Sequence, residues 1–280
     1  MPENVNFLLF NFSILKEIVM SRTVMENEKI IEHIVHGLEY YMKTLALPSH
    51  MEKHVDKVCS WIKPKEGINN GPEGVYKVNF ENMSDKQIRH LVQYYSKRGA
   101  PDYWFVSPFS KPDNLRNILA ELGKMLNNDM GMAIPPEKMA HAPWRTKYDP
   151  LIPVKRVDTK SDFKIWADIV NKTLFDKQII DPDHYYPLCE SGKIICFLGF
   201  CGKTPAATSM TLMTDNMSGK LEWIATLLEY RKKGMGTAVC CAGIEQLIKD
   251  RARIITLTAR EMGISLYETL GFKIYFQFGR

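Results

Sequence analysis

The residues with the clearest chemical potential lie at positions 230–237, where the sequence reads YRKKGMGT. This segment follows an apolar run typical of a strand and opens a run whose apolar residues recur at helical spacing. Backbone N–H groups at the start of a helix have no partner within it, and the helix dipole favours negative charge beside them. Glycines at 234 and 236 let an anion approach the backbone, and three cationic residues precede them. The segment therefore predicts a diphosphate-binding turn.

Two other interpretations of this string remain to be weighed. A glycine-containing strand-to-helix turn with a solvated basic stretch would give the same letters. A dinucleotide-binding fingerprint needs Gly-x-Gly-x-x-Gly inside a parallel βαβ unit. That fingerprint fits poorly, because position 239 is Val and the strands before the turn are predicted to be antiparallel.

The elements around the turn alternate between strands and helices. Hydrophobic periodicity predicts strands at 153–157, 193–201, 206–215, 220–227, 253–258 and 272–278, and helices at 161–175, 236–249 and 263–270. Residues 181–187 are predicted to be a loop. The resulting order is β-α-β-β-β-α-β-α-β, with the turn between the fourth strand and the second helix.

The N-terminal half also mixes helices and strands. Helices are predicted at 26–61, at 85–97 with Ser84 as the cap, and from Pro112 to Gly123, and strands at 75–80, 103–106 and 130–134. Residues 140–153 contain three prolines and few apolar runs, which is typical of a boundary. We therefore predict a mixed α/β domain at 1–145 and a second domain, which carries the turn, at 150–280.

Four motifs in the second domain occur in a fixed order. They read IATL at 224–227, RKKGMGTA at 231–238, LTAR at 257–260 and GISLYETLGF at 263–272. Together they resemble the GNAT superfamily of N-acetyltransferases over residues 150–280. The resemblance implies an α/β fold of the acyl-CoA acyltransferase type, with a mostly antiparallel mixed sheet that splays into a V. Residues 1–145 resemble the extra half of two-part members, a degenerate GNAT-like unit without a second cofactor site.

The resemblance also implies a cosubstrate and a reaction. Acetyl-CoA, with no metal, would give its acetyl group to a primary amine that attacks directly. The backbone near Thr226 would bind the acetyl carbonyl and stabilise its oxyanion. The residues that the resemblance assigns to the cofactor are Ala225, Thr226, Leu227, Arg231, Lys232, Lys233, Gly234, Met235, Gly236, Thr237 and Ser265.

The departing thiolate needs a proton. Tyr267 stands where the family often places its general acid, and a phenol can donate to a sulfur anion at close range. The alternative is that Tyr267 only lines the site as a half-buried aromatic. Arg260 stands where some family members have Asn, so a role of that Asn does not transfer to this chain.

The amine must lose a proton before it attacks, and several groups are candidates for the base. Glu222 lies four residues before Thr226, which would place both side chains on one face of a regular strand. A surface glutamate would show the same spacing. A base acting through ordered water is equally open, and so are the polar residues of the predicted loop, Asp181, Asp183 and His184.

Composition limits the classes of partner. The formal net charge is +5 and the pI about 8.7, which is too weak to indicate nucleic-acid binding. The basic stretches also lack the interleaved aromatic residues that single-strand binders use. No apolar run reaches the roughly 18 residues of a membrane span. Residues 7–15 are largely apolar but lack the flanks of a signal peptide, and Met20 or Met25 could be alternative starts.

Six cysteines without a C-x-x-C pair indicate reduced thiols and a cytoplasmic protein. His50 and His54 lie four residues apart, but no ligand-spaced partners surround them, so no metal site is predicted. The acceptor stays open among small amines, polyamines, antibiotics and protein termini. A monomer or a homodimer fits equally. The main rival function is a non-catalytic CoA-binding regulatory module.

Overall fold

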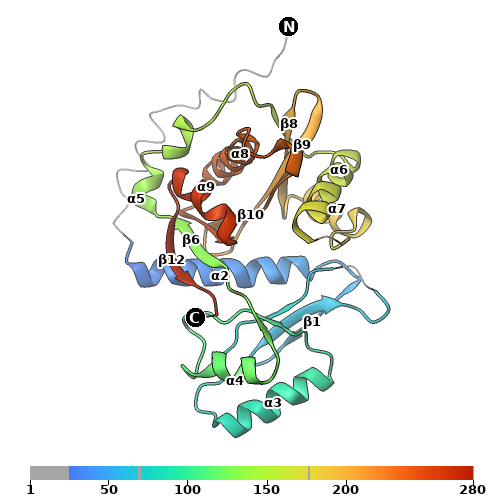
Figure 1. Cartoon of the computed structure of the whole chain (residues 1–280), viewed down its shortest axis with the longest axis vertical. Helices are drawn as coiled ribbons and strands as arrows, with labels where there is room; N and C mark the ends of the chain where they lie inside the picture. The colour runs from blue at the N-terminus through green and yellow to red at the C-terminus, as the bar shows by residue number, and fades with distance from the viewer. Residues whose placement is uncertain (1–24, 69–70, 176, 280) are drawn as a thin grey trace.

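A computed structural model describes residues 25–68, 71–175 and 177–279. The predictions on the apolar run at 7–15 and on Met20 lie outside the described residues. Within the described part, the strands form one five-stranded and one seven-stranded sheet. Helix α2 (Asn27–Leu45) lies between the two sheets (Figure 1). The predicted mixed α/β class is confirmed.

The five-stranded sheet belongs to the N-terminal half. Its order is β1-β2-β3-β4-β5, antiparallel from β1 to β3 and parallel from β3 to β5. Its strands are β1 (Met51–Val55), β2 (Ser60–Pro64), β3 (Gly74–Tyr76), β4 (Tyr103–Trp104) and β5 (Met125–Leu126). Helices α3 (Asp85–Lys97) and α4 (Leu115–Glu121) pack against it around the buried Trp104.

The seven-stranded sheet has the order β12-β6-β11-β10-β9-β8-β7. Its strands are β6 (Met130–Ile134), β7 (Val154–Arg156), β8 (Ile195–Cys201), β9 (Thr204–Met213), β10 (Ser218–Thr226), β11 (Ile254–Ala259) and β12 (Lys273–Gln277). All neighbouring pairs are antiparallel except β10 and β11, which are parallel. This arrangement confirms the predicted mostly antiparallel sheet.

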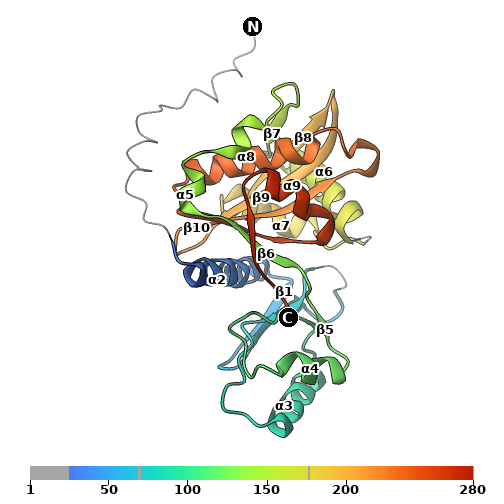
Figure 2. The ribbon, with the colours of Figure 1, turned by 60° about the vertical axis from the view of Figure 1, so that its left-hand side comes forward.

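Helices cover both faces of the larger sheet (Figure 2). On one face, here called the α8 face, lie α8 (Met235–Lys249) and α9 (Ile264–Thr269). On the other, here called the α2 face, lie α2 and α6 (Lys160–Val170), with α7 (Pro182–Glu190) beside α6. Neighbouring residues of β10 show the alternation: Leu221 packs against Gly243 of α8, whereas Lys220 packs against Gly37 of α2.

Strand β6 comes from the part predicted as the N-terminal domain, yet it lies inside the larger sheet. It pairs with β11, where Met130 opposes Ala259, and with β12, where Met130 opposes Gln277. A connection through α5 (Pro136–Met139) and the 3-10 turn η2 (Pro143–Thr146) then follows α8, where Arg145 pairs with Glu245. The division into domains at 1–145 and 150–280 stays a prediction, but the two parts share a sheet.

Two element predictions are wrong. The helix predicted at 26–61 ends at Leu45, and the β1–β2 hairpin occupies residues that the prediction gave to the helix. Pro48 has no backbone N–H to continue the helix, and the residues after it form the antiparallel hydrogen bonds between β1 and β2 instead. The segment predicted to be a loop at 181–187 is helix α7. Asp181 caps this helix by accepting from the Asp183 N–H (2.9 Å), and Pro182 occupies its first position, where a proline is favoured.

Other element predictions hold. Ser84 begins α3 with a reciprocal capping box to Gln87. The predicted helix at 161–175 is α6 followed by the π-helical turn η3 (Asn171–Phe175). The predicted order of the C-terminal half is confirmed once α7 is added, so the turn at 230–237 lies between a strand and a helix, as expected.

Candidate active site

Strands β10 and β11 pair over only three residues each. The parallel ladder joins Ser218–Lys220 to Ile254–Thr256 and then stops, although β10 continues to Thr226 and β11 to Ala259. The neighbours on both outer sides stay paired, β9 with β10 and β6 with β11. The sheet therefore splays between β10 and β11, which agrees with the predicted V-shaped gap.

A β-bulge interrupts the pairing of β10 with β9, on the edge of β10 away from this gap. Between the pairs Glu222–Met210 and Ala225–Thr208, two residues of β10 oppose one of β9, and Trp223 has a left-handed φ of 51°. An extra residue reverses the alternation of side chains beyond it. Glu222 therefore lies on the α2 face, and Thr226 on the α8 face near Gly236. The prediction that Glu222 and Thr226 share a face is wrong, because regular pleating does not continue through the bulge.

Side chains bridge the strands where the ladder ends. Glu222 Oε1 accepts from Thr258 Oγ1 (2.6 Å) and from the Thr258 backbone N–H (3.3 Å), across the gap. The same oxygen lies 2.7 Å from Nζ of Lys220, whose side chain is fully buried. A buried ammonium is tolerated only with a close counter-charge and further hydrogen bonds. This Lys220–Glu222–Thr258 bridge holds the splayed strands at a fixed spacing.

The turn after β10 presents backbone donors to solvent. After the 3-10 turn η4 (Leu228–Tyr230), residues 231–234 are exposed, and α8 begins at Met235. Its N-cap is Gly234, at φ 77°, which has no side chain to cap the helix. Arg231 Nε donates to the Thr226 carbonyl (3.2 Å), and Lys233 Nζ to the Glu229 carbonyl (3.1 Å). Both cations are therefore fixed beside the helix start.

The space around Gly236 tests whether a phosphate-bearing ligand fits. A Cβ placed there would lie 3.3 Å from Leu266 Cδ2 and 3.5 Å from Thr226 Oγ1, in ordinary or slightly tight contact. Between the first turn of α8, the end of β10 and α9 there is thus a narrow passage with room for about one methyl group. Glycine keeps this passage open, and the cations around it favour an anion. The residues present fit a diphosphate.

Tyr267 stands on α9 near the same gap. Its side chain is 7% exposed and packs edge-on against Phe272, with ring centroids 6.0 Å apart. Burial above all, and then the neighbouring Cys240, Glu222 and Asp129, raise the pKa of Tyr267 well above its usual value. The phenol therefore keeps its proton at neutral pH.

Comparison with known proteins agrees with this geometry. Residues 151–272 match the family model described as "Acetyltransferase (GNAT) family". These residues form a GNAT acetyltransferase domain. A domain of this family implies acyl transfer from acetyl-CoA, and the predicted resemblance is confirmed over residues 151–272. No curated protein matches the chain.

Solved structures share the fold over both halves of the chain. A GCN5-related N-acetyltransferase from Kribbella flavida has a TM-score of 0.65 at 13% identity, covering 88% of this chain and 93% of that one. A GCN5-related N-acetyltransferase-like protein from Streptococcus suis has 0.52 at 10%, covering 90% and 98%. A functionally unknown conserved protein from Staphylococcus epidermidis has 0.53 at 15%, covering 74% and 81%. At these identities the likeness shows the fold alone.

The GNAT domain brings most of the proposed cofactor residues to the two sides of the gap. Ala225 is buried on β10, and the Leu227 N–H donates to the Ala206 carbonyl (2.9 Å), so that amide is used within the sheet. Ser265 is exposed on α9. Lys232 has a left-handed φ of 57°, beside the similar Gly234. Thr237 follows Gly236 in the first turn of α8.

The alternative bases are engaged elsewhere. Asp181 caps α7, and Asp183 pairs with Lys160 (2.8 Å). His184 stacks on the buried His50, with ring centroids 4.1 Å apart. The contacts of these three residues thus stabilise α7 and its packing against neighbouring residues. Arg260, at the end of β11, donates to the Leu174 carbonyl (3.3 Å) in η3.

Sequence reasoning missed Lys220 and Thr258. The signal was present for Lys220, since it lies two residues before Glu222 on a strand whose other residues are mostly apolar. A buried strand lysine two positions from a glutamate on the same face indicates an ion pair. Thr258 could not be found from the sequence, because its contact with Glu222 depends on how far the two strands diverge.

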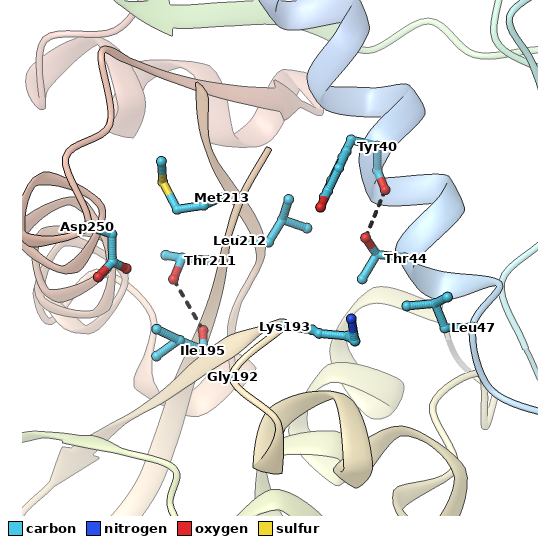
Figure 3. A pocket seen from close by; sticks show the side chains of 10 residues that line it. All are labelled: Tyr40, Thr44, Leu47, Gly192, Lys193, Ile195, Thr211, Leu212, Met213 and Asp250. Carbon is cyan, nitrogen blue, oxygen red and sulfur yellow. Dashed lines mark hydrogen bonds between the residues drawn. The ribbon is translucent and has the colours of Figure 1, made fainter. Parts of the chain in front are cut away.

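A cavity of about 150 Å³ lies at the opposite end of the larger sheet (Figure 3). Its walls come from α2, the start of β8 and the end of β9, and include Thr44, Lys193 and Thr211. The end of β9 lies beside Gly219 at the start of β10, whereas the phosphate-binding turn follows the end of β10. This cavity is therefore separate from the splay.

Three further features concern only the described residues. None of their His, Cys, Asp and Glu side chains form a group of three or more that could hold a metal ion. None of their helices combines the length and apolar character required to cross a bilayer. All six cysteines are unpaired, and five of them are buried.

Proposed function

We propose that this protein is an acetyl-CoA-dependent N-acetyltransferase that moves an acetyl group to a primary amine by direct attack. The observation that carries the proposal is the splay between β10 and β11, which opens beside a glycine turn with exposed backbone donors. The splay would accommodate the narrow pantetheine arm of CoA, and the turn would bind its diphosphate. Acetyl-CoA contains both, and it supplies the activated acetyl group.

The backbone from Lys233 to Thr237 would hold the diphosphate, with Arg231 and Lys232 adding positive charge. Residues 225–227 would line the arm at the open end of β10, and Ser265 would line it from α9. The left-handed Trp223 marks the point where β10 departs from regular pairing with β9. Beyond the bulge the Leu227 N–H donates to the Ala206 carbonyl of β9, so alternation along the strand would direct the neighbouring Thr226 N–H to the open side, where it could bind a carbonyl as an oxyanion site requires.

Tyr267 would protonate the departing thiolate. Its raised pKa keeps the phenol protonated over the whole neutral range, and its place on α9 is next to the gap. Glu222 is our candidate for the proton acceptor. Its Oε1 is committed to Lys220 and Thr258, but 11% of its side chain is exposed, so a water molecule can carry the proton to it.

Two measurements test this function. Isothermal titration with acetyl-CoA should show binding that requires Gly236, and a panel of primary amines should release CoA thiol from acetyl-CoA. Loss of release in Tyr267→Phe with binding retained is the expected result. Tight binding with no release for any amine would instead favour the non-catalytic CoA-binding module.

The proposal extends to the acceptor, the location and the oligomeric state. The acceptor is a small-molecule or peptide amine, since such amines are the class that direct attack on an acetyl group requires. The unpaired cysteines favour a cytoplasmic location. The protein acts as a monomer or homodimer, and gel filtration with light scattering distinguishes these.

A further inference from the structure

Three polar residues of the N-terminal half, Tyr103, Asn127 and Asp129, lie at the open end of the splay. Asp129 immediately precedes β6, and Met130 opposes Ala259 at the end of β11. The ladder with β12 continues to this point, since the Phe278 N–H donates to the Asp129 carbonyl (3.0 Å). Asp129 therefore flanks β11 on one side, just as Glu222 flanks it on the other through Thr258.

The pleat places Asp129 on the α2 face of the sheet. A Cβ at Gly131 would lie 3.1 Å from Ile34 of α2, so position 131 faces α2. Asp129 lies two residues earlier, where the Phe278 N–H still continues the ladder with β12, and this gives Asp129 the same face. Glu222 is also on that face, whereas the glycine turn belongs to the α8 face. The two carboxylates thus lie on the side of the gap opposite the diphosphate.

Asn127 fixes the carboxylate of Asp129. Asn127 is 1% exposed, and its Nδ2 donates to Asp129 Oδ2 (3.0 Å) and to the Tyr103 hydroxyl (2.8 Å). Its Oδ1 accepts from the Asp129 backbone N–H (2.9 Å). A buried amide with three satisfied hydrogen bonds holds its neighbours in one arrangement. Asp129 itself remains partly exposed.

The surrounding charges leave Asp129 free to bind a cation. Among the described residues no ion pair includes Asp129, while Glu222 pairs with Lys220. The nearby Arg260 donates to the Leu174 carbonyl. Burial and then the charge of Asp129 raise the pKa of Tyr103, and Asp129 also contributes to the raised pKa of Tyr267. Asp129 is therefore within electrostatic reach of the proposed acid.

We propose that Asp129 binds the ammonium group of the acceptor amine and orients it towards the splay, with Asn127 as its positioning residue. This inference rests on the proposed function and deepens it. It gives the N-terminal half a direct part in acceptor recognition. It also predicts that a cationic amine is preferred over a neutral analogue of the same size.

The test uses the full chain and a panel of spermidine, n-butylamine, kanamycin and a peptide with a free N-terminus. The best acceptor is then compared in wild type, Asp129→Asn and Asp168→Asn, a matched control on the exposed face of α6. Acceptor KM and kcat, calorimetric binding of the same amine, and the Kd of acetyl-CoA are measured for each. Tyr103→Phe, which removes a partner of Asn127, provides a second variant.

Loss of one charged hydrogen bond corresponds to about a tenfold to hundredfold loss of affinity. We expect Asp129→Asn to raise the acceptor KM and Kd by that factor with acetyl-CoA affinity unchanged, and Tyr103→Phe to raise both by less. A folded Asp129→Asn with wild-type acceptor affinity would overturn the inference alone. If that variant does not fold, unchanged acceptor affinity in Tyr103→Phe overturns it. Failure of wild type to acetylate any amine would refute the proposed function, and this inference with it.

Discussion

Gly236 gives the most decisive test of where the diphosphate binds. Its φ is not left-handed, so a side chain there meets no backbone strain, and an added Cβ finds only Leu266 at 3.3 Å and Thr226 at 3.5 Å. Alanine is also a better helix former than glycine, by up to about 1 kcal/mol. Gly236→Ala should therefore fold with nearly unchanged stability, while its methyl group fills the passage beside β10 and weakens binding of acetyl-CoA.

Charge can be separated from size by a pair of variants at the same position. Gly236→Gln and Gly236→Glu differ by one charge at nearly constant volume. A unit charge about 5 Å from one phosphate charge interacts by about 3 kcal/mol at an effective dielectric constant of about 20. We therefore expect the glutamate variant to bind acetyl-CoA roughly a hundredfold more weakly than the glutamine variant at low salt.

Isothermal titration of acetyl-CoA at low and high salt measures this difference. The gap between the two variants should shrink as salt increases, because part of the turn is exposed and added ions screen it. Acetylpantetheine, which lacks the diphosphate, should bind both variants equally. Equal affinity of the glutamine and glutamate variants for acetyl-CoA at low salt would show that no phosphate lies at this turn.

Three more predictions follow from the same geometry. Tyr267→Phe should lower kcat by about a hundredfold or more without changing the Kd of acetyl-CoA. In the wild type the raised pKa of Tyr267 means that the phenol holds its proton more tightly than usual. The wild-type kcat should therefore show no decline from phenol ionisation below about pH 10. Glu222→Gln leaves the fully buried Lys220 without a counter-charge, so denaturant unfolding should show a loss of about 3–5 kcal/mol, largely recovered in the double variant with Lys220→Met. A fragment of residues 150–280 lacks β6 and should show no cooperative unfolding transition, whereas the full chain should.

The glycine turn was predictable because its signals are local. The apolar run of β10, the cations at 231–233 and the two glycines lie within one short segment, and the physics of a helix N-terminus needs no distant partner. Ser84 was predictable for the same reason, since its capping box involves residues three apart. Helix α7 had an equally local signal, Asp181 followed by Pro182, which composition alone made look like a loop.

The bulge and the place of β6 could not be predicted from local patterns. The register of β10 is set by its pairing with β9, and nothing in the residue type of Trp223 requires a left-handed φ. Strand β6 is separated by more than a hundred residues from β11 and β12, its two partners. Its apolar run fits a buried strand in either half of the chain. Only the folded sheet shows that the N-terminal half contributes a strand to the larger sheet.

The splay explains why a buried ion pair lies beside the proposed catalytic gap. When a ladder stops inside a sheet, the freed N–H and C=O groups need other partners, since an unpaired buried group costs about 1–3 kcal/mol. Glu222 satisfies one of these by accepting from the Thr258 N–H, and Lys220 compensates its charge. The gap is thus held open by the protein's own bonds before any ligand arrives. Because the opening is preformed, acetyl-CoA binding should need little rearrangement of β10 and β11, and affinity should depend mainly on the turn at Gly236.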